Sequence, residues 1–139
     1  MTEKTVKKKI LLVVDDDEIH LSVARRMLED KYECLTADSG KKALDYFLKG
    51  QFPNLVLLDV FMPDMDGWET YKRIQALSFL KDIPIAFLTS ASETEEKEHA
   101  FALGAADFIT KPYEKKDLLK RINKIIKNKE GPDKSKKTP

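Results

Sequence analysis

Residues 55–69 read LVLLDVFMPDMDGWE: four apolar side chains lead to Asp59, and an Asp-Gly pair at Asp66 and Gly67 follows. A short apolar run that ends in turn-forming residues is typical of a strand buried on both faces of a sheet. The Asp-Gly pair predicts a turn, and from Trp68 to Leu77 the apolar side chains return at helical spacing. The stretch therefore predicts a strand, a loop that begins with a carboxylate, and a helix.

The same alternation of apolar runs and helix-spaced segments extends in both directions. The apolar runs, which we expect to form strands, are residues 10–14, 33–37, 55–58, 85–88 and 107–109. Helical spacing is found near residues 19–28, 43–48, 68–77, 93–103 and 118–126. For the fourth helix, Ser92 is the expected N-terminal cap and Gly104 the expected C-terminal cap. This pattern predicts an α/β domain whose parallel sheet is covered by helices on both faces.

The composition is that of one globular domain. The chain has 139 residues, of which 42% are hydrophobic, enough to form a core without disulfides. The single cysteine, Cys34, excludes an internal disulfide and favours a reducing compartment. The longest apolar run near the start, residues 10–14, is too short for a membrane span or a signal peptide. We therefore expect a cytoplasmic protein with no membrane partner.

The net charge of +1 combines an acidic body with two basic ends. Residues 1–9 carry +3 and residues 127–139 carry another +3, which leaves −5 on residues 10–126. We expect a basic N-terminal extension at 1–9, a folded domain at 10–128, and a disordered tail or truncated linker at 129–139. The tail has no aromatic side chain for base stacking, so we expect no direct nucleic-acid binding by this domain.

Polar residues follow several of the predicted strands at one edge of the sheet, because parallel strands end at the same edge. That edge is where open α/β sheets bind ligands. The residues there are Asp15, Asp16, Asp17, Asp59, Thr89 and Lys111. Clustered carboxylates favour a hard cation, and few ligands with open water positions favour Mg²⁺ over Ca²⁺. A carboxylate nucleophile, a hydroxyl and an ammonium beside such an ion are suited to phosphoryl transfer. Asp17 itself is better explained as a helix cap.

Four spaced motifs resemble one known family. They are LLVVDDDE at 11–18, LVLLDVFMPDMDGWE at 55–69, AFLTSA at 86–91 and GAADFITKPY at 104–113. Together they are similar to the receiver domains of bacterial response regulators, the CheY-like family, over about residues 9–128. The resemblance implies a (βα)5 flavodoxin-like fold, a doubly wound five-stranded parallel sheet with strand order 2-1-3-4-5. It also implies a phosphoacceptor signalling domain that catalyses only its own modification. Its phosphodonor is a sensor histidine kinase or a histidine phosphotransfer protein.

The resemblance also assigns the acceptor and the metal ligands. Asp59 matches the phosphoacceptor, and the implied cofactor is Mg²⁺, for which Mn²⁺ can substitute. Asp16 resembles the direct metal ligand, Asp15 one that acts largely through metal-bound water, and Phe61 one that offers its backbone carbonyl.

The remaining matched positions concern phosphoryl contact and switching. Lys111 matches the lysine that contacts the phosphoryl group, and the bond between Lys111 and Pro112 resembles the family's cis peptide. Thr89 matches the switch hydroxyl, and Phe108 the switch aromatic, although the same ring can also serve the core. The implied output surface is the face made by the fourth helix, the fifth strand and the fifth helix.

The resemblance implies that two further positions tune the reaction chamber of the family. The residues two after the acceptor and two after the switch hydroxyl are Phe61 and Ala91, and neither side chain can orient an attacking water. We hypothesise a comparatively long-lived phosphoaspartate. The competing interpretation is that both residues only pack.

Charge and histidine placement leave further alternatives open. Acids gather in the fourth helix and lysines in the fifth, which suits either a phosphorylation-dependent homodimer or two solvated helix faces. His20 and His99 lie on different predicted helices and are interpreted as surface or satisfied histidines.

Two other classes of function compete with the phosphorylated switch. One is an interaction module that keeps the fold but does not use phosphate. The other is an enzyme, either an aspartate-dependent phosphatase or a flavin-binding protein. The DxDxT pattern of such phosphatases and a phosphate loop after the first strand are both missing, which disfavours the enzymes.

Overall fold

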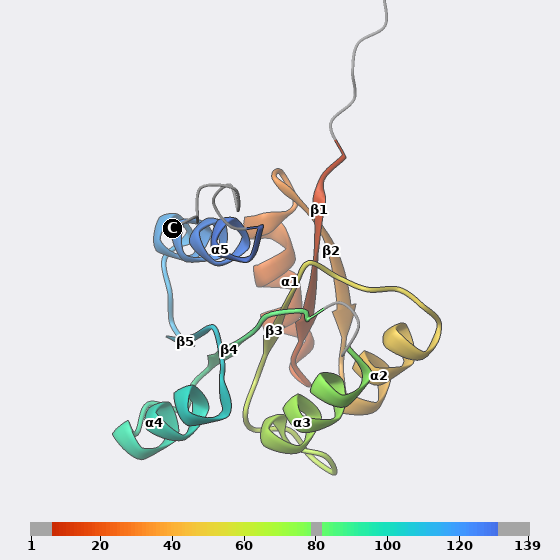
Figure 1. Cartoon of the computed structure of the whole chain (residues 1–139). Helices are drawn as coiled ribbons and strands as arrows, with labels where there is room; N and C mark the ends of the chain where they lie inside the picture. The colour runs from red at the N-terminus through yellow and green to blue at the C-terminus, as the bar shows by residue number, and fades with distance from the viewer. Residues whose placement is uncertain (1–6, 79–81, 131–139) are drawn as a thin grey trace, which may run out of the picture.

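The computed structural model describes residues 7–78 and 82–130, and these form a five-stranded parallel sheet (Figure 1). The strands are β1 (Lys9–Val14), β2 (Tyr32–Ala37), β3 (Leu55–Leu58), β4 (Ile85–Thr89) and β5 (Asp107–Thr110). Their order across the sheet is β2-β1-β3-β4-β5. The predicted fold class and strand order are therefore confirmed.

Helices cover both faces of the sheet. On one face lie α1 (Glu18–Leu28) and α5 (Lys115–Glu130), and on the other α2 (Gly40–Leu48), α3 (Gly67–Leu77) and α4 (Thr94–Leu103) (Figure 1). Alternate residues of each strand feed the two cores: Leu12 and Val14 face the second layer, whereas Leu11 and Val13 face the first. The strands are therefore apolar throughout, as the unbroken apolar runs predict.

The central strands hold the functional edge in register. All four residues of β3 are fully buried, and burying each such side chain contributes about 1.5–3 kcal/mol. Val14 of β1 pairs with Leu58 of β3. The ladder continues one residue further, because the Asp59 amide donates to the Val14 carbonyl at 3.0 Å. Asp15 and Asp59 therefore leave the sheet at the same level.

The start of α4 differs from the prediction. The cap position is held by Glu93, not Ser92. Its backbone N–H donates to a carboxylate oxygen of Glu96 at 3.2 Å, so a glutamate one turn into the helix satisfies the terminus. Gly104 ends the helix with a φ of 103°, in the left-handed region that favours glycine.

The chain ends bear on the predicted boundaries. Strand β1 includes Lys9 and α5 continues through Glu130, so each reaches slightly beyond the expected domain limits of 10 and 128. Residues 1–6 of the predicted basic extension and 131–139 of the predicted tail lie outside the described residues. In the described part of the chain, no helix has the length and apolar composition needed to span a bilayer.

Candidate functional site

The strand order reverses direction at β1, whose two neighbours are β2 and β3. In open α/β sheets the crevice at such a point, beyond the carboxyl ends of the strands, is where ligands bind. Asp15 follows β1 and Asp59 follows β3. The topology thus brings together two carboxylates that are far apart in the sequence.

Three carboxylates gather at this edge. One oxygen each from Asp15, Asp16 and Asp59 lies within 4.8 Å of the others; Asp15 and Asp59 are buried and Asp16 is exposed. Asp17 instead caps α1, accepting from the backbone N–H groups of Ile19 and His20 at 2.9 and 3.3 Å. The predicted cap at Asp17 is confirmed, and these backbone hydrogen bonds lower its carboxyl pKa.

Lys111 brings a positive charge into the cluster. Its Nζ donates to Asp15 Oδ2 and lies 3.7 Å from Asp59 Oδ2. Its backbone N–H donates to the Thr89 carbonyl at 2.8 Å, which fixes the residue just beyond the ends of β4 and β5. The Lys111–Pro112 peptide is cis.

Asp59 is the least satisfied of the buried carboxylates. The residue is only 6% exposed, and its Oδ1 has no hydrogen-bond partner among the described residues. Burial raises the pKa of the carboxyl because it penalises the charged form; the Thr89 hydroxyl and the Lys111 ammonium act in the opposite direction. An orphaned, buried carboxylate oxygen beside two other carboxylates fits an oxygen-ligated divalent cation.

The loop after Asp59 is held tightly against the start of α3. The Gly67 N–H donates to the Val60 carbonyl at 2.8 Å, and a Cβ at Gly67 would lie 2.2 Å from the Asp59 carbonyl oxygen. Only glycine allows this approach. Phe61, within the loop, is 53% exposed, whereas Ala91 is buried at 3%. Core packing therefore accounts for Ala91 but not for the ring of Phe61.

Thr89 and Phe108 occupy buried positions beside the carboxylates. Thr89 is fully buried, and its Oγ1 accepts from the Ala91 N–H at 3.1 Å. The Phe108 ring is 4% exposed and packs 6.2 Å from the Phe87 ring. Phe108 is therefore a core residue here, one of the two roles that the sequence leaves open.

His20 reaches the site, although its sequence pattern predicts no role there. Its Nδ1 lies 2.9 Å from Lys111 Nζ and 3.4 Å from Asp15 Oδ2. The available signal was its place in the first turn of the helix that follows Asp15 and Asp16, since that turn starts at the functional edge. His99 lies elsewhere, with its ring edge-on to Trp68 at 4.5 Å.

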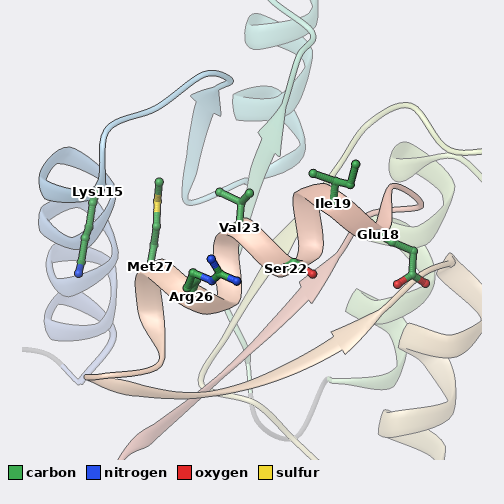
Figure 2. A pocket seen from close by; sticks show the side chains of 7 residues that line it. All are labelled: Glu18, Ile19, Ser22, Val23, Arg26, Met27 and Lys115. Atoms are coloured by element: carbon green, nitrogen blue, oxygen red, sulfur yellow. The ribbon is translucent and has the colours of Figure 1, made fainter.

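A groove runs from the site along α1. One part lies between α1 and the segment after β5 and is lined by His20, Val23, Met27, Ser90, Lys111, Pro112 and Tyr113. The other, shown in Figure 2, is lined mainly by one side of α1, with Lys115 of α5 at its end. Val23 and Met27 line both parts. We call this surface the α1 groove; it is apolar and opens beside Lys111.

Known proteins are similar to this chain in sequence and in fold. The family model for the response regulator receiver domain matches residues 11–123. A probable transcriptional regulator, ycf27 of Cyanophora paradoxa, is 40% identical over 131 residues, covering 91% of this chain and 51% of that protein. The solved structure of the Vibrio cholerae chemotaxis protein CheY4 has 33% identity and a TM-score of 0.78, covering 85% of this chain and 98% of that one. The non-phosphorylated HemR receiver domain of Leptospira biflexa has 35% identity and a TM-score of 0.76, covering 86% and 94%.

The matched segment is only part of each full-length relative. The chain spans about half the length of the curated relatives it matches first. The family match, by contrast, covers most of this chain and includes the carboxylates, the lysine, most of β1 and the other four strands. The chain therefore belongs to the response regulator receiver domains of two-component signalling, and its acidic pocket of Asp15, Asp16 and Asp59 is typical of their phosphoacceptor site.

Proposed function

We propose that Asp59 accepts a phosphoryl group from the phosphohistidine of a sensor histidine kinase or a histidine phosphotransfer protein. A carboxylate oxygen of Asp59 attacks phosphorus, the bond from phosphorus to the donor imidazole nitrogen breaks, and the nitrogen keeps the electron pair. The observation that carries this proposal is the buried Asp59 Oδ1, which has no protein partner among the described residues and lies in a cluster of carboxylates beside Lys111.

The proposed cofactor is Mg²⁺, with Mn²⁺ as a substitute. Asp16 and Asp59 would hold it directly, Asp15 largely through water, and Phe61 through its backbone carbonyl. The ion supplies charge neutralisation for the carboxylates and the phosphoryl oxygens. Because it binds the folded state, millimolar Mg²⁺ should raise the melting temperature of the wild-type chain, and Asp16→Asn should reduce that rise. An equal rise in both would contradict this ligand set.

Lys111, Thr89 and Phe108 have proposed roles around the phosphoryl group. The Lys111 ammonium, 3.7 Å from Asp59 Oδ2, contacts a phosphoryl oxygen. The Thr89 hydroxyl, buried at the end of β4, turns toward the modified aspartate, and the Phe108 ring moves into the space that Thr89 vacates. The α4–β5–α5 face changes with them and serves as the output surface.

The α1 groove is the proposed docking surface for the phosphodonor protein. A donor must bring its phosphohistidine to Asp59, so it must cover the mouth of the site, and the groove adjoins that mouth at Lys111. Ile19 and Val23, at 71% and 41% exposed, offer apolar surface that a partner can bury. Such a partner, together with the lone half-buried Cys34, favours a cytoplasmic location.

The test is incubation with acetyl phosphate and Mg²⁺ followed by intact mass measurement. The proposal expects one added phosphoryl group on the wild-type chain and none on Asp59→Asn. No addition to the wild type would favour the alternative, a phosphorylation-independent interaction module of the same fold.

A further inference from the structure

We propose that His20 is a positioning residue for Lys111: its Nδ1 accepts a hydrogen bond from the ammonium and holds Lys111 at the mouth of the phosphoacceptor site. The proposal rests on the proposed function of Asp59 and adds a residue to that site. Its basis is the 2.9 Å contact between His20 Nδ1 and Lys111 Nζ.

The direction of this hydrogen bond follows from the chemistry of the two groups. An ammonium has three donors and no acceptor, so Nδ1 must be the acceptor and carries no hydrogen in this contact. In the neutral ring the hydrogen is then on Nε2, which lies 3.9 Å from Asp17 Oδ2. That distance is too long for a hydrogen bond, but the charge of Asp17 favours this orientation of the ring.

The helix start fixes the backbone from which the imidazole extends. His20 lies in the first turn of α1, and its own N–H donates to the capping Asp17 at 3.3 Å. The ring therefore extends from a fixed helix start, which leaves only the two side-chain torsions to bring Nδ1 to Lys111.

The surroundings of the ammonium explain why a second anchor matters. Lys111 Nζ contacts Asp15 and His20 and lies 3.7 Å from Asp59. Asp15 is also a proposed metal ligand, so its oxygens are shared. His20 also lies near that carboxylate, with Nδ1 3.4 Å from Asp15 Oδ2, but it is not itself a proposed metal ligand. Without it, the flexible lysine side chain samples more positions, and fewer of them place the charge where the phosphoryl group is transferred.

Two substitutions at His20 distinguish the effect of losing the hydrogen-bond acceptor from the effect of changing the shape of the side chain. His20→Asn keeps an oxygen that can take the place of Nδ1, whereas His20→Leu removes the acceptor. His20 is 45% exposed in its side chain, so both variants should fold, and circular dichroism checks that they do. The rate measured is the initial phosphorylation of each protein by acetyl phosphate with Mg²⁺.

We expect His20→Leu to slow phosphorylation roughly tenfold, the size of one lost hydrogen bond to a charged group, and His20→Asn to recover most of the rate. The second readout needs no metal: the ¹⁵N signal of the Lys111 ammonium, detectable only when hydrogen bonds slow its exchange with water. It should be present in the wild type and His20→Asn and lost in His20→Leu.

The outcomes separate this inference from the function on which it rests. Equal rates in the wild type and His20→Leu, or an unchanged ammonium signal, would overturn the role of His20 and leave Asp59 as the acceptor. Slowing of both variants alike would also overturn it. If the wild type takes no phosphoryl group, the proposed function fails, and the ammonium signal alone then decides whether His20 holds Lys111.

Discussion

At the scale of single residues, the site contains carboxylates whose burial and mutual repulsion are only partly offset by hydrogen bonds and by the charge of Lys111. Asp59 carries most of this cost, since it is buried and one of its oxygens has no partner in the described part of the chain. Lys111 lies between Asp15 and Asp59 and offsets part of the repulsion. The stability of the unmodified domain should therefore depend on the ionisation of Asp59.

Replacing Asp59 by asparagine should stabilise the domain near neutral pH. The folded-state pKa of Asp59 is raised, so the stability that this residue contributes is greatest at acid pH and is lost as the pH rises through that value. Without added Mg²⁺ at about pH 7, Asp59→Asn should raise the free energy of unfolding by roughly 1–3 kcal/mol. This gain in stability should become smaller as the pH falls toward the usual pKa range of an aspartate side chain. Urea unfolding over a pH series measures it, with Asp30→Asn, at an exposed carboxyl, as the control. An equal gain at all pH values would argue against the burial of a charged Asp59.

The pair Phe61 and Ala91 should give the phosphorylated domain a long lifetime. Phe61 is half-exposed and Ala91 is buried, and neither side chain can orient an attacking water. Replacing them with Phe61→Asn and Ala91→Glu should speed loss of the phosphoryl group, which is followed by intact mass after removal of acetyl phosphate. If the wild type loses it as fast as the double variant, the hypothesis is wrong.

At the scale of helices and strands, the sequence predicts those features that depend on a local pattern of apolar and polar residues. The apolar runs at 10–14 and 55–58 form buried central strands because both of their faces need apolar side chains. The acidic site follows from these runs, since each strand end carries its own polar residue. The strand pattern therefore predicts that Asp15 and Asp59 lie at one edge of the sheet, whereas the family resemblance implies the strand order that makes β1 and β3 neighbours.

Contacts between elements are harder to predict. The approach of His20 to Lys111 depends on how α1 and the segment after β5 lie across the sheet, and no local pattern encodes that geometry. The pairing of Trp68 with His99 likewise joins α3 to α4. The predicted start of α4 was wrong by one residue, because Glu96 satisfies the N–H of Glu93 and makes a serine cap unnecessary.

The α1 groove yields a prediction about the choice of phosphodonor. Val23→Lys places a charge on the apolar surface between the site and Lys115. It should slow transfer from a histidine kinase that phosphorylates the wild type by roughly tenfold or more, since burying an unpaired charge in an interface is costly. The rate with acetyl phosphate should remain as in the wild type, because that donor needs no groove. Leu48→Lys, an equivalent change at an exposed position of α2, is the control. If both variants slow the transfer equally, the α1 groove is not the surface that binds the donor.

At the scale of the whole molecule, the charge is divided between neighbouring helices. Exposed acids lie at the cap and in the first turns of α4, and exposed lysines line α5: Glu93, Glu95, Glu98, Lys115, Lys116, Lys120 and Lys124. Among the described residues, none of these forms an ion pair within the chain. Arg121, by contrast, is already paired with Asp107 and Asp117. The unpaired sets leave complementary charge for a second copy.

We expect this charge to support a homodimer that forms on phosphorylation. Sedimentation should give a monomer for the unmodified chain and a dimer with beryllofluoride, which mimics the phosphoryl group. Added salt should weaken the dimer because exposed charges are screened. A monomer in both conditions would leave α4 and α5 as two solvated faces.

Asp59 is the residue that we expect to become phosphorylated. Borohydride reduces an aspartyl phosphate to homoserine, so the chain treated with acetyl phosphate and Mg²⁺ can be reduced, digested and sequenced by mass spectrometry. We expect homoserine at position 59 and at no other aspartate. Homoserine at Asp15 or Asp16 instead, or a phosphoryl group that remains on His20, would contradict it.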